Sequence, residues 1–547
     1  MLKPEAGNEI PAATARVAKA AFPKNNRIMT LRDAFGTIYK DEDFKGLFSS
    51  TGQPALTPWR LALVTIFQFL EGLSDREAAD AVRSRIDWKY ALGLELDDPG
   101  FNFSVLSEFR DRLIEGEAEH ILLDKLLEHF QAQGLLKAGG KQRSDATHIL
   151  AQVRALNRSE CIMESLRAAL NVIATADPAW LKAWVPKTWF ERYSLRVEES
   201  RLVKEKHARV DYLEQVGRDG FELLQRTYTT TSHSYLADLP IIDILRQVWL
   251  HHFWLNEEGR VTYREAKDLA PAKARLSSPY DSEAEFGKKN IYTWTGYKVF
   301  ITETCDMDAP RVVSNVTTTG AGISDVTQTA GIHEALKAKQ LLPKVHLVDG
   351  GFIDTNLLLD SAKHYGVELI GPVRRNRGWQ AKIPEAYDIS RFTIDWDAQV
   401  MTCPQGKLSS SWTPTQTPKG AVRIAVKFRY ADCTYCETRY LCTCSRKGSK
   451  AFTLKSFEAQ KVLEAARVNQ EQPEWRERYK VRSGIEATMS QGVRTHDLRR
   501  SRYRGLRKTA LQHVATASAI NVQRVTEWLG GFPIAPTRVS SFARLAA

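Results

Sequence analysis

The sequence predicts an α/β core with a mixed sheet, which follows an all-α amino-terminal domain and carries helical and irregular inserts. Two features predict this fold class. Between residues 57 and 130 apolar residues recur at helical spacing, whereas from residue 290 to residue 373 runs rich in Thr, Val, Ile and Tyr alternate with helical stretches. This β-β-β-α-β-α-β order is typical of a mixed sheet with helices on its faces.

Length and composition restrict the class of protein. A chain of 547 residues predicts several structural units, and 43% hydrophobic with 26% charged residues is typical of a folded soluble protein. No run of about 18 apolar residues predicts a membrane span, and no signal-peptide core is present. Seven cysteines in 547 residues do not fit the disulfide framework of a secreted protein, so we expect a cytoplasmic protein. The net charge of +12 favours a nucleic-acid partner.

The amino-terminal part is expected to contain a leader and a helical domain. Residues 1–55 are rich in Pro, Gly and Ala and are predicted to be loosely structured. Residues 56–137 are predicted to form helices, with Thr57-Pro58 as a cap and first-turn proline and Ser74 with Glu77 as a capping box. The pattern fits both a DNA-reading helical domain and a plain helical bundle.

Residues 138–530 are expected to form the α/β core, and residues 531–547 a tail. A Trp-rich helical insert is predicted at about 150–275, and an irregular insert that contains most of the cysteines at about 378–450. The run 291–305 alternates and predicts a strand pair.

Two aspartates lie on predicted strands of this core. Asp145 is inside a short β-leaning run, and Asp349 follows the apolar strand VHLV and precedes Gly350-Gly351. A carboxylate at the carboxyl end of a strand lies where open α/β sheets place their chemistry. Asp-Gly is also a common turn, so the local pattern leaves both interpretations open.

A third carboxylate, Glu486, belongs to the block Tyr479-x-x-Arg482-x-x-x-Glu486. Intervals of three and four predict that the three side chains share one helical face, although the same spacing fits an ordinary ion pair on a solvated helix. Gly484 lowers the helix propensity by about 1 kcal/mol, which favours a close contact there. Three carboxylates on separate elements suit two Mg²⁺ or Mn²⁺ ions, which prefer oxygen ligands.

The order Asp145, Asp349, Glu486, together with the Tyr479 block, resembles the DDE transposases of bacterial insertion sequences, which are named after these residue types. Residues 57–94 and 280–306 resemble the helical domain and a strand segment of that family. The family's glutamate helix carries a lysine seven positions after the glutamate, with six residues between them. Here Val493 stands at that position and Arg494 beside it, so Arg494 is the candidate for the missing cation.

The resemblance implies an RNase H-like catalytic domain in which Asp145, Asp349 and Glu486 are catalytic and bind two metal ions. It implies a prokaryotic enzyme that binds terminal inverted repeats and target DNA, cleaves DNA and transfers strands. A homodimer on DNA, with neither a membrane nor a small-molecule cofactor, is also expected. A non-catalytic DNA-binding regulator and a related metal-dependent nuclease remain the alternatives.

A basic run surrounds Glu486. Residues 475–508 contain eleven Lys or Arg against three acidic residues, which makes +8 of the net charge of +12. Such a cluster with an interleaved tyrosine is typical of phosphate contact and base stacking, although a solvated face has the same composition. The DNA-binding candidates are Tyr479, Arg482, Arg494, Arg499, Arg500, Arg502 and Arg504.

Four cysteines of the second insert, Cys403, Cys433, Cys436 and Cys442, are candidates for a zinc site. Cys403 lacks the second cysteine of a complete knuckle, so reduced, non-ligating thiols are the alternative.

Overall fold

The computed structural model describes residues 1–2, 9–49, 51–198, 203–271, 274–376, 378–417, 420, 422–445, 448–532 and 541–545. The chain divides into two compact units. Unit 1 consists of Met1–Lys137, Asp145–Ile323 and Ile485–Ala547, and unit 2 consists of Ala138–Ser144 and Ser324–Gly484.

The predicted helical domain is present in unit 1. Pro58 is the first residue of α3, and the Ser74–Glu77 capping box opens α4 with both of its reciprocal hydrogen bonds. The capping box satisfies backbone N–H groups that have no partner inside the helix. Thr57, predicted as the cap of α3, makes no side-chain cap hydrogen bond, so that part of the prediction is wrong. The helices of this domain are α3 (Pro58–Glu71), α4 (Asp75–Ser84), α5 (Ile86–Leu92), α6 (Ser104–Glu115) and α7 (Ile121–Ala132).

The expectation that residues 1–55 are loosely structured is wrong. They contain α1 (Ala12–Ala21), α2 (Arg27–Phe35) and the 3-10 helix η1 (Asp41–Leu47). Ala18 and Met29 are buried together with Tyr90 in a small apolar cluster. The leader folds because the helical domain provides a surface on which its few apolar residues are buried.

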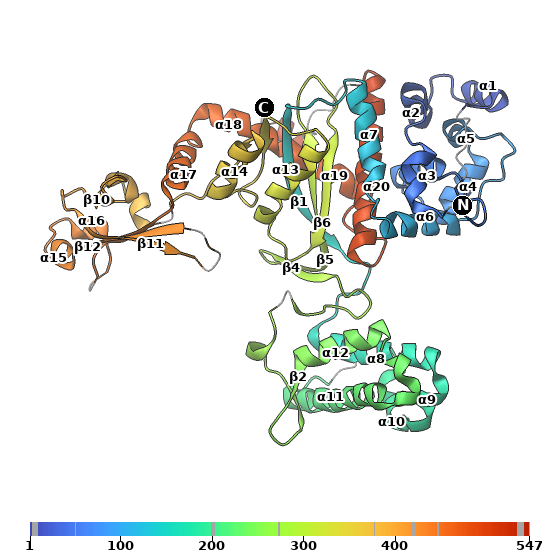
Figure 1. The fold of residues 1–547 in the computed structure, drawn as a ribbon, viewed down its shortest axis with the longest axis horizontal. Coiled ribbons are helices and arrows are strands. Elements are labelled where there is room, and N and C mark those ends of the chain that lie inside the picture. Colours follow the sequence, from blue (N-terminus) through green and yellow to red (C-terminus); the bar gives the residue numbers. More distant parts are fainter. Residues whose placement is uncertain are drawn as a thin grey trace. The chain divides into compact units, whose positions relative to one another are not determined.

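The long helix α20 (Leu506–Leu529) is the central element of unit 1. It packs against α3, α6, α7 and the strand β6 (Val313–Gly320), and Figure 1 shows it beside α7. Its sequence predicts an amphipathic helix, but its residues from Leu511 to Val522 are buried on all faces. Asn521 satisfies its buried amide by donating to Val313 O at 2.9 Å and accepting from Val313 N at 2.7 Å.

The sheet of unit 1 contains β4 (Glu285–Lys289), β5 (Tyr292–Thr304) and β6, which pair antiparallel. The prediction of a strand pair within residues 291–305 is wrong, because β5 is one strand of 13 residues. Its partner β4 precedes it, and Asn290 takes the positive φ of 56° that the turn between them requires.

The strand β1 (Lys141–Leu150) runs from unit 2 into unit 1. In unit 2 it pairs in parallel with β7 (Val345–Leu347), which pairs in parallel with β8 (Glu368–Ile370), and Arg143 is aligned with Leu347. The strand order is β4-β5-β1-β7-β8, with β6 also on β5. The predicted mixed sheet is therefore confirmed, and α13 (Thr329–Ala338) and α14 (Thr355–Tyr365) connect its parallel strands.

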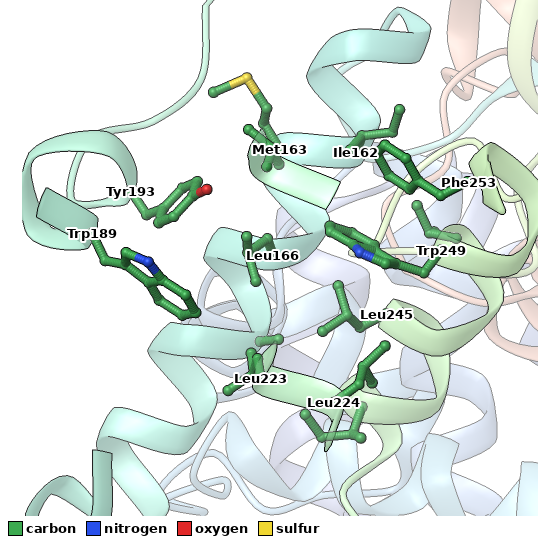
Figure 2. Packing of buried hydrophobic residues seen from close by; sticks show 14 of the residues in the cluster. Ile162, Met163, Leu166, Trp189, Tyr193, Leu223, Leu224, Leu245, Trp249 and Phe253 are labelled. Carbon is green, nitrogen blue, oxygen red and sulfur yellow. The ribbon is translucent and has the colours of Figure 1, made fainter. Parts of the chain in front are cut away.

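The first insert is mostly helical, as predicted, and belongs to unit 1. Figure 2 shows its own core, in which Trp249 packs among Leu166, Leu245 and Phe253. Trp249 donates its indole N–H to Gly217 O at 2.8 Å, which satisfies the polar atom of a fully buried ring. The elements are α8 (Arg158–Ala176), α9 (Pro178–Trp184), α10 (Lys187–Tyr193), α11 (Lys206–Thr229), η3 (Thr231–Leu236), α12 (Pro240–His252), β2 (Phe253–Leu255), β3 (Val261–Tyr263) and η4 (Ala266–Asp268).

The second insert, in unit 2, is more regular than the sequence predicts. A three-stranded antiparallel sheet and a two-stranded hairpin enclose a small core of Phe392, Met401, Val426, Phe428 and Leu454. The elements are β9 (Thr393–Asp395), β10 (Val400–Thr402), β11 (Ser409–Gln416), β12 (Val422–Phe428), α15 (Tyr430–Thr434), α16 (Arg439–Cys442) and β13 (Ala451–Leu454).

The carboxyl-terminal part of the chain is helical. Its elements are α17 (Phe457–Asn469), α18 (Pro473–Lys480), η9 (Val481–Gly484), α19 (Ile485–Thr495), α20 and α21 (Ser541–Arg544). Residues 533–540 and 546–547 of the predicted tail lie outside the described residues.

Candidate functional site

Two of the three predicted carboxylates, Asp145 and Glu486, line one pocket of about 340 Å³ in unit 1. Asp145 comes from β1, and Glu486 from the first turn of α19. The pocket therefore joins two residues that lie far apart in the sequence. Its lining is Asp145, Ala146, Thr147, Glu486, Met489, Ser490, Val493, Arg494 and Arg499.

The pocket places two arginines beside these carboxylates. Arg499 donates to Thr147 Oγ1 at 3.1 Å, which fixes it next to β1. Val493, at the position of the family's lysine, and its neighbour Arg494 both line the pocket. Positive charge at this site is suited to an anionic ligand such as a DNA phosphate.

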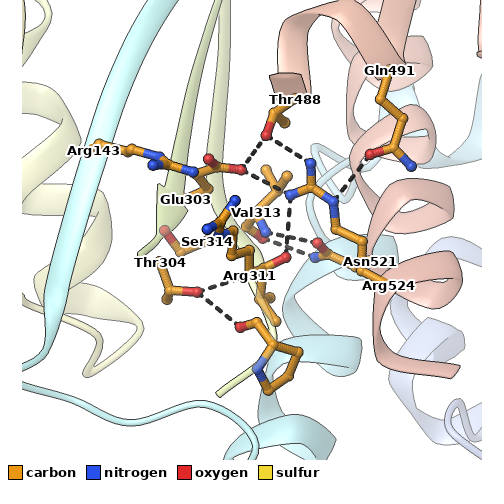
Figure 3. Close-up of polar contacts among 12 residues, drawn as sticks. Arg143, Glu303, Thr304, Arg311, Val313, Ser314, Thr488, Gln491, Asn521 and Arg524 are labelled. Carbon is orange, nitrogen blue, oxygen red and sulfur yellow. Dashed lines mark hydrogen bonds and ion pairs between the residues drawn. The ribbon is translucent and has the colours of Figure 1, made fainter. Parts of the chain in front are cut away.

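A buried ion pair holds the helix that carries Glu486. Arg524 of α20 donates to Glu303 Oε2 of β5 at 2.8 Å, and the Glu303 side chain is completely buried (Figure 3). Thr488 of α19 donates to the same Oε2 at 2.5 Å and accepts from Arg524 Nη2 at 2.7 Å. Arg524 Nε donates to Gln491 Oε1 at 3.1 Å. One carboxylate and one guanidinium thus connect β5, α19 and α20.

Sequence reasoning missed both Glu303 and Arg524. A signal was present, because each is a charged residue in an otherwise apolar strand or helix. Charged residues are almost never fully buried unless they are paired. The identity of the partner, 221 positions away, is a property of the tertiary structure.

We predict that Arg524→Met lowers the free energy of unfolding by about 3 kcal/mol, because it removes one partner of a buried ion pair. Denaturant unfolding measures this loss. The matched control is Arg246→Met, since Arg246 forms an exposed ion pair with Asp243 at 2.6 Å, and such a pair contributes less than about 1 kcal/mol. Equal losses in the two variants would show that the Arg524 pair has no special role.

The third carboxylate, Asp349, lies in unit 2 directly after β7. Its Oδ1 accepts from Gly351 N at 2.7 Å, and its Oδ2 lies 3.9 Å from Arg482 Nη2. A Cβ at Gly351 would lie 3.0 Å from Asp349 Oδ1 and 3.1 Å from Asp325 Oδ2. The glycine therefore allows two carboxylates to approach the same backbone segment, and the Asp-Gly turn coexists with an exposed acidic group.

The block from Tyr479 to Glu486 is not a single α-helix, so the basis of the predicted common face is changed. The helix α18 ends at Lys480, η9 contains Arg482, and α19 begins at Ile485. The predicted close contact at Gly484 is present, because a Cβ there would lie 2.1 Å from Arg143 Nη1. Arg143 also donates to Val481 O at 2.5 Å, so η9 is fixed by the side chain of a β1 residue.

A chain of buried hydrogen bonds in unit 2 connects β1 and β7 with the helices α13 and α14. Ser144 Oγ, one residue before Asp145, lies 2.7 Å from His346 Nε2 on β7. His346 Nδ1 lies 2.8 Å from His333 Nε2 on α13, and His333 Nδ1 lies 3.5 Å from Ser361 Oγ on α14. Burial lowers the pKa of His333 to about 4 and holds the pKa of His346 well below its ordinary value, so both rings are neutral at pH 7.

This chain predicts a loss of stability in acid. The unfolded chain binds protons below the ordinary histidine pKa of 6.5, whereas folded His333 stays neutral down to a pKa of about 4. Stability is therefore complete above pH 6.5 and falls as the pH drops toward 4, by about 3 kcal/mol for this residue. Unfolding measured between pH 4 and 7 should show a smaller pH dependence in His333→Gln. His364→Gln, at a side chain that is 62% exposed, should not change the pH dependence.

The predicted DNA-binding residues fall into three groups by their contacts within the protein. Arg502 donates to Leu73 O at 2.9 Å and lies over the Phe69 ring, so it also contacts the helical domain, and its DNA contact stays a prediction. Arg494, Arg499, Arg500 and Arg504 form no ion pair with a described residue. Tyr479 stacks on Trp475 with ring centroids 4.8 Å apart, and Arg482 faces Asp349.

The four predicted zinc cysteines, Cys403, Cys433, Cys436 and Cys442, line one pocket of about 520 Å³ in unit 2. In the part of the chain that the structure describes, however, no three His, Cys, Asp or Glu side chains form a group that could hold a metal ion. Zinc binding therefore stays a prediction from the sequence. Metal analysis of protein purified without added zinc tests it, and a metal-free, fully folded protein would refute it.

Comparison with known families agrees with the predicted resemblance. Residues 402–526 match the family model described as "Transposase DDE domain", and residues 16–112 match "Transposase domain (DUF772)". The first match contains Tyr479, Arg482 and Glu486. No curated protein and no solved structure matches the chain. Among the described helices, none has the length and apolar character needed to cross a membrane. Together the two family matches confirm the resemblance and support a DDE transposase of the insertion-sequence type.

Proposed function

We propose that this protein binds the ends of a mobile element and catalyses metal-dependent cleavage and transfer of DNA strands. The observation that carries the proposal is the pocket that joins Asp145 and Glu486 with Arg494 and Arg499. Carboxylates suit divalent cations, and arginines suit the phosphates on which such cations act.

The strand register supports Asp349 as the third member. Arg143 of β1 is aligned with Leu347 of β7, and each aspartate lies two residues further along its own chain. Asp349 follows the carboxyl end of β7, whereas Asp145 lies in the middle of β1, and in this proposal the two aspartates act together. Open α/β sheets place their chemistry at the carboxyl ends of their strands. A mixed sheet with catalytic carboxylates on these strands is consistent with the RNase H-like fold that the family implies.

The proposed donor set suits Mg²⁺ or Mn²⁺ by its chemistry, although the described residues form no group of three that could hold a metal ion. Asp145, Asp349 and Glu486 offer only carboxylate oxygens, which are the ligands that these hard cations prefer. When bound, two such ions activate an attacking oxygen and stabilise the leaving one during phosphodiester displacement. In the proposal the three side chains hold the metal ions. Two of the three carboxylates would not complete the set of ligands.

The remaining residues would bind and orient DNA. Arg494 and Arg499 lie at the pocket and would contact the phosphates that flank the cleaved bond. Arg482 beside Asp349, and Tyr479 on the exposed α18, would position the strand. Water would first attack the phosphodiester at the element's end, and the freed 3′-hydroxyl would then attack target DNA. Pairing of two ends implies a homodimer on DNA, acting in the cytoplasm of a prokaryote.

Asp349→Asn should abolish Mg²⁺-dependent nicking while DNA binding is retained, because the substitution removes a metal-binding charge without changing size. Nicking is measured on a plasmid that carries the coding sequence with its native flanking DNA. The matched control is Asp360→Asn on α14, whose side chain is 58% exposed and lies 3.9 Å from His364. This variant should nick at the normal rate.

Three outcomes are decisive for the assignment. Nicking by Asp349→Asn at the normal rate would contradict the role of Asp349. DNA binding without nicking in the natural sequence would favour a non-catalytic regulator, and nicking without strand joining would favour a nuclease.

A further inference from the structure

A second pocket in unit 1, of about 290 Å³, lies between the helical insert and the start of β5. It is distinct from the carboxylate pocket, because the two have no lining residue in common. Its polar lining includes Arg158 of α8, His252 of α12 and Arg275, and Phe286 of β4 lies at it with 46% of its surface exposed. The described residues that line it include no Asp or Glu.

The pocket concentrates positive charge without compensation. Arg158, Arg264 and Arg275 lie close enough to depress the pKa values of His251 and His252, and burial is the largest cause in both histidines. None of the three arginines forms an ion pair with a residue that the structure describes. Like charges held together without an acidic partner are unfavourable, so the folded chain keeps them against a cost in stability.

Two members of the cluster form hydrogen bonds with described residues, whereas Arg275 forms none with any residue that the structure describes. Arg158 donates to His252 Nδ1 at 3.1 Å and to Arg264 O at 2.7 Å, and it lies 3.8 Å from the centre of the Tyr263 ring. Arg264 donates to Phe253 O at 3.1 Å. The Nε of Arg275 is buried and, within the described chain, has no hydrogen-bond partner. A buried guanidinium donor without a partner is expensive unless a ligand satisfies it.

The other polar groups at the pocket are compatible with an anion. His252 is neutral, because its pKa is lowered to about 3, and its Nδ1 accepts from Arg158, so its other ring nitrogen carries a proton. The pKa of the buried Cys161 thiol is raised to about 12, so the thiol is also uncharged. The pocket therefore presents two cations and neutral groups, with no group that would repel a phosphate.

We propose that this pocket binds a phosphate group of the DNA backbone, with Arg158 and Arg275 as its cationic ligands. Guanidinium groups bind phosphate oxygens through paired N–H donors, which would satisfy Arg275. The site would hold DNA away from the carboxylate pocket and would not take part in strand cleavage. It rests on the proposed function only in the choice of DNA as the source of the phosphate.

The test measures the affinity for a duplex of arbitrary sequence between about 50 and 200 mM salt. Loss of one phosphate contact in Arg275→Ala should reduce the slope of log affinity against log salt by about one. The affinity deficit of this variant should then shrink by about threefold across that salt range. Arg275→Lys keeps the charge and should recover most of the slope.

The matched control is Arg246→Ala, which removes an exposed arginine of the same insert that is already paired with Asp243. Its slope should equal that of the natural sequence. Arg275→Ala should also unfold at a temperature no lower than the natural sequence, because it removes a repelled charge and an unsatisfied donor. Equal slopes for Arg275→Ala and Arg246→Ala would overturn the proposal, as would unfolding of Arg275→Ala under the binding conditions.

A measurement with inorganic phosphate distinguishes DNA from a small phosphate compound as the source of the bound phosphate. A rise in unfolding temperature with added phosphate, present in the natural sequence and absent in Arg275→Ala, confirms a phosphate site. If this rise occurs while the salt slopes are equal, the pocket binds a small phosphate compound and the DNA assignment is wrong. Strand cleavage enters none of these measurements, so their failure is distinguishable from failure of the proposed function.

Discussion

The buried pair of Glu303 and Arg524 is the interaction on which the organisation of unit 1 depends most. It connects the central strand β5, the long helix α20 and the helix α19, which carries Glu486. A charge that is completely removed from water is tolerated only with a partner and further hydrogen bonds, and this pair has both. The same bonds that satisfy Glu303 also determine where α19 lies, so the candidate catalytic glutamate is positioned by a polar contact behind it.

Hydrogen bonds perform a similar task in unit 2. The chain from Ser144 through His346 and His333 to Ser361 connects β1, β7 and two helices just before the aspartates. Arg143 then fixes η9 where Gly484 leaves room for it. In both units, buried polar groups lie directly behind the residues proposed for catalysis. Buried polar groups limit the conformations that a site can adopt more strongly than apolar contacts do. A conformation that leaves a buried polar group without its hydrogen-bond partner has a high free energy.

The two inserts explain why the carboxylates are so far apart in the sequence. Each insert has its own apolar core, one around Trp249 and one around Met401 and Val426. A segment with its own core can be accommodated between strands of a sheet without disturbing their pairing. The first insert also contains the cluster of Arg158, Arg264 and Arg275, so it adds positive charge at a second place in unit 1.

The sequence by itself determined the order of strands and helices in the core, the capped helices of the amino-terminal domain and the candidate carboxylates. These follow from periodicity and capping residues, which act over a few neighbouring positions. It misjudged residues 1–55 and the irregular insert, because their folding depends on small cores assembled from distant or sparse apolar residues. It also predicted one helix for Tyr479–Glu486, where contact between Gly484 and Arg143 favours a 3-10 turn. Only the tertiary structure decided that Asp145 and Glu486 share a pocket, that Arg502 donates to Leu73 O, and that Glu303 pairs with Arg524. The physical reason is that burial and pairing of charge depend on residues hundreds of positions apart, which no local pattern encodes.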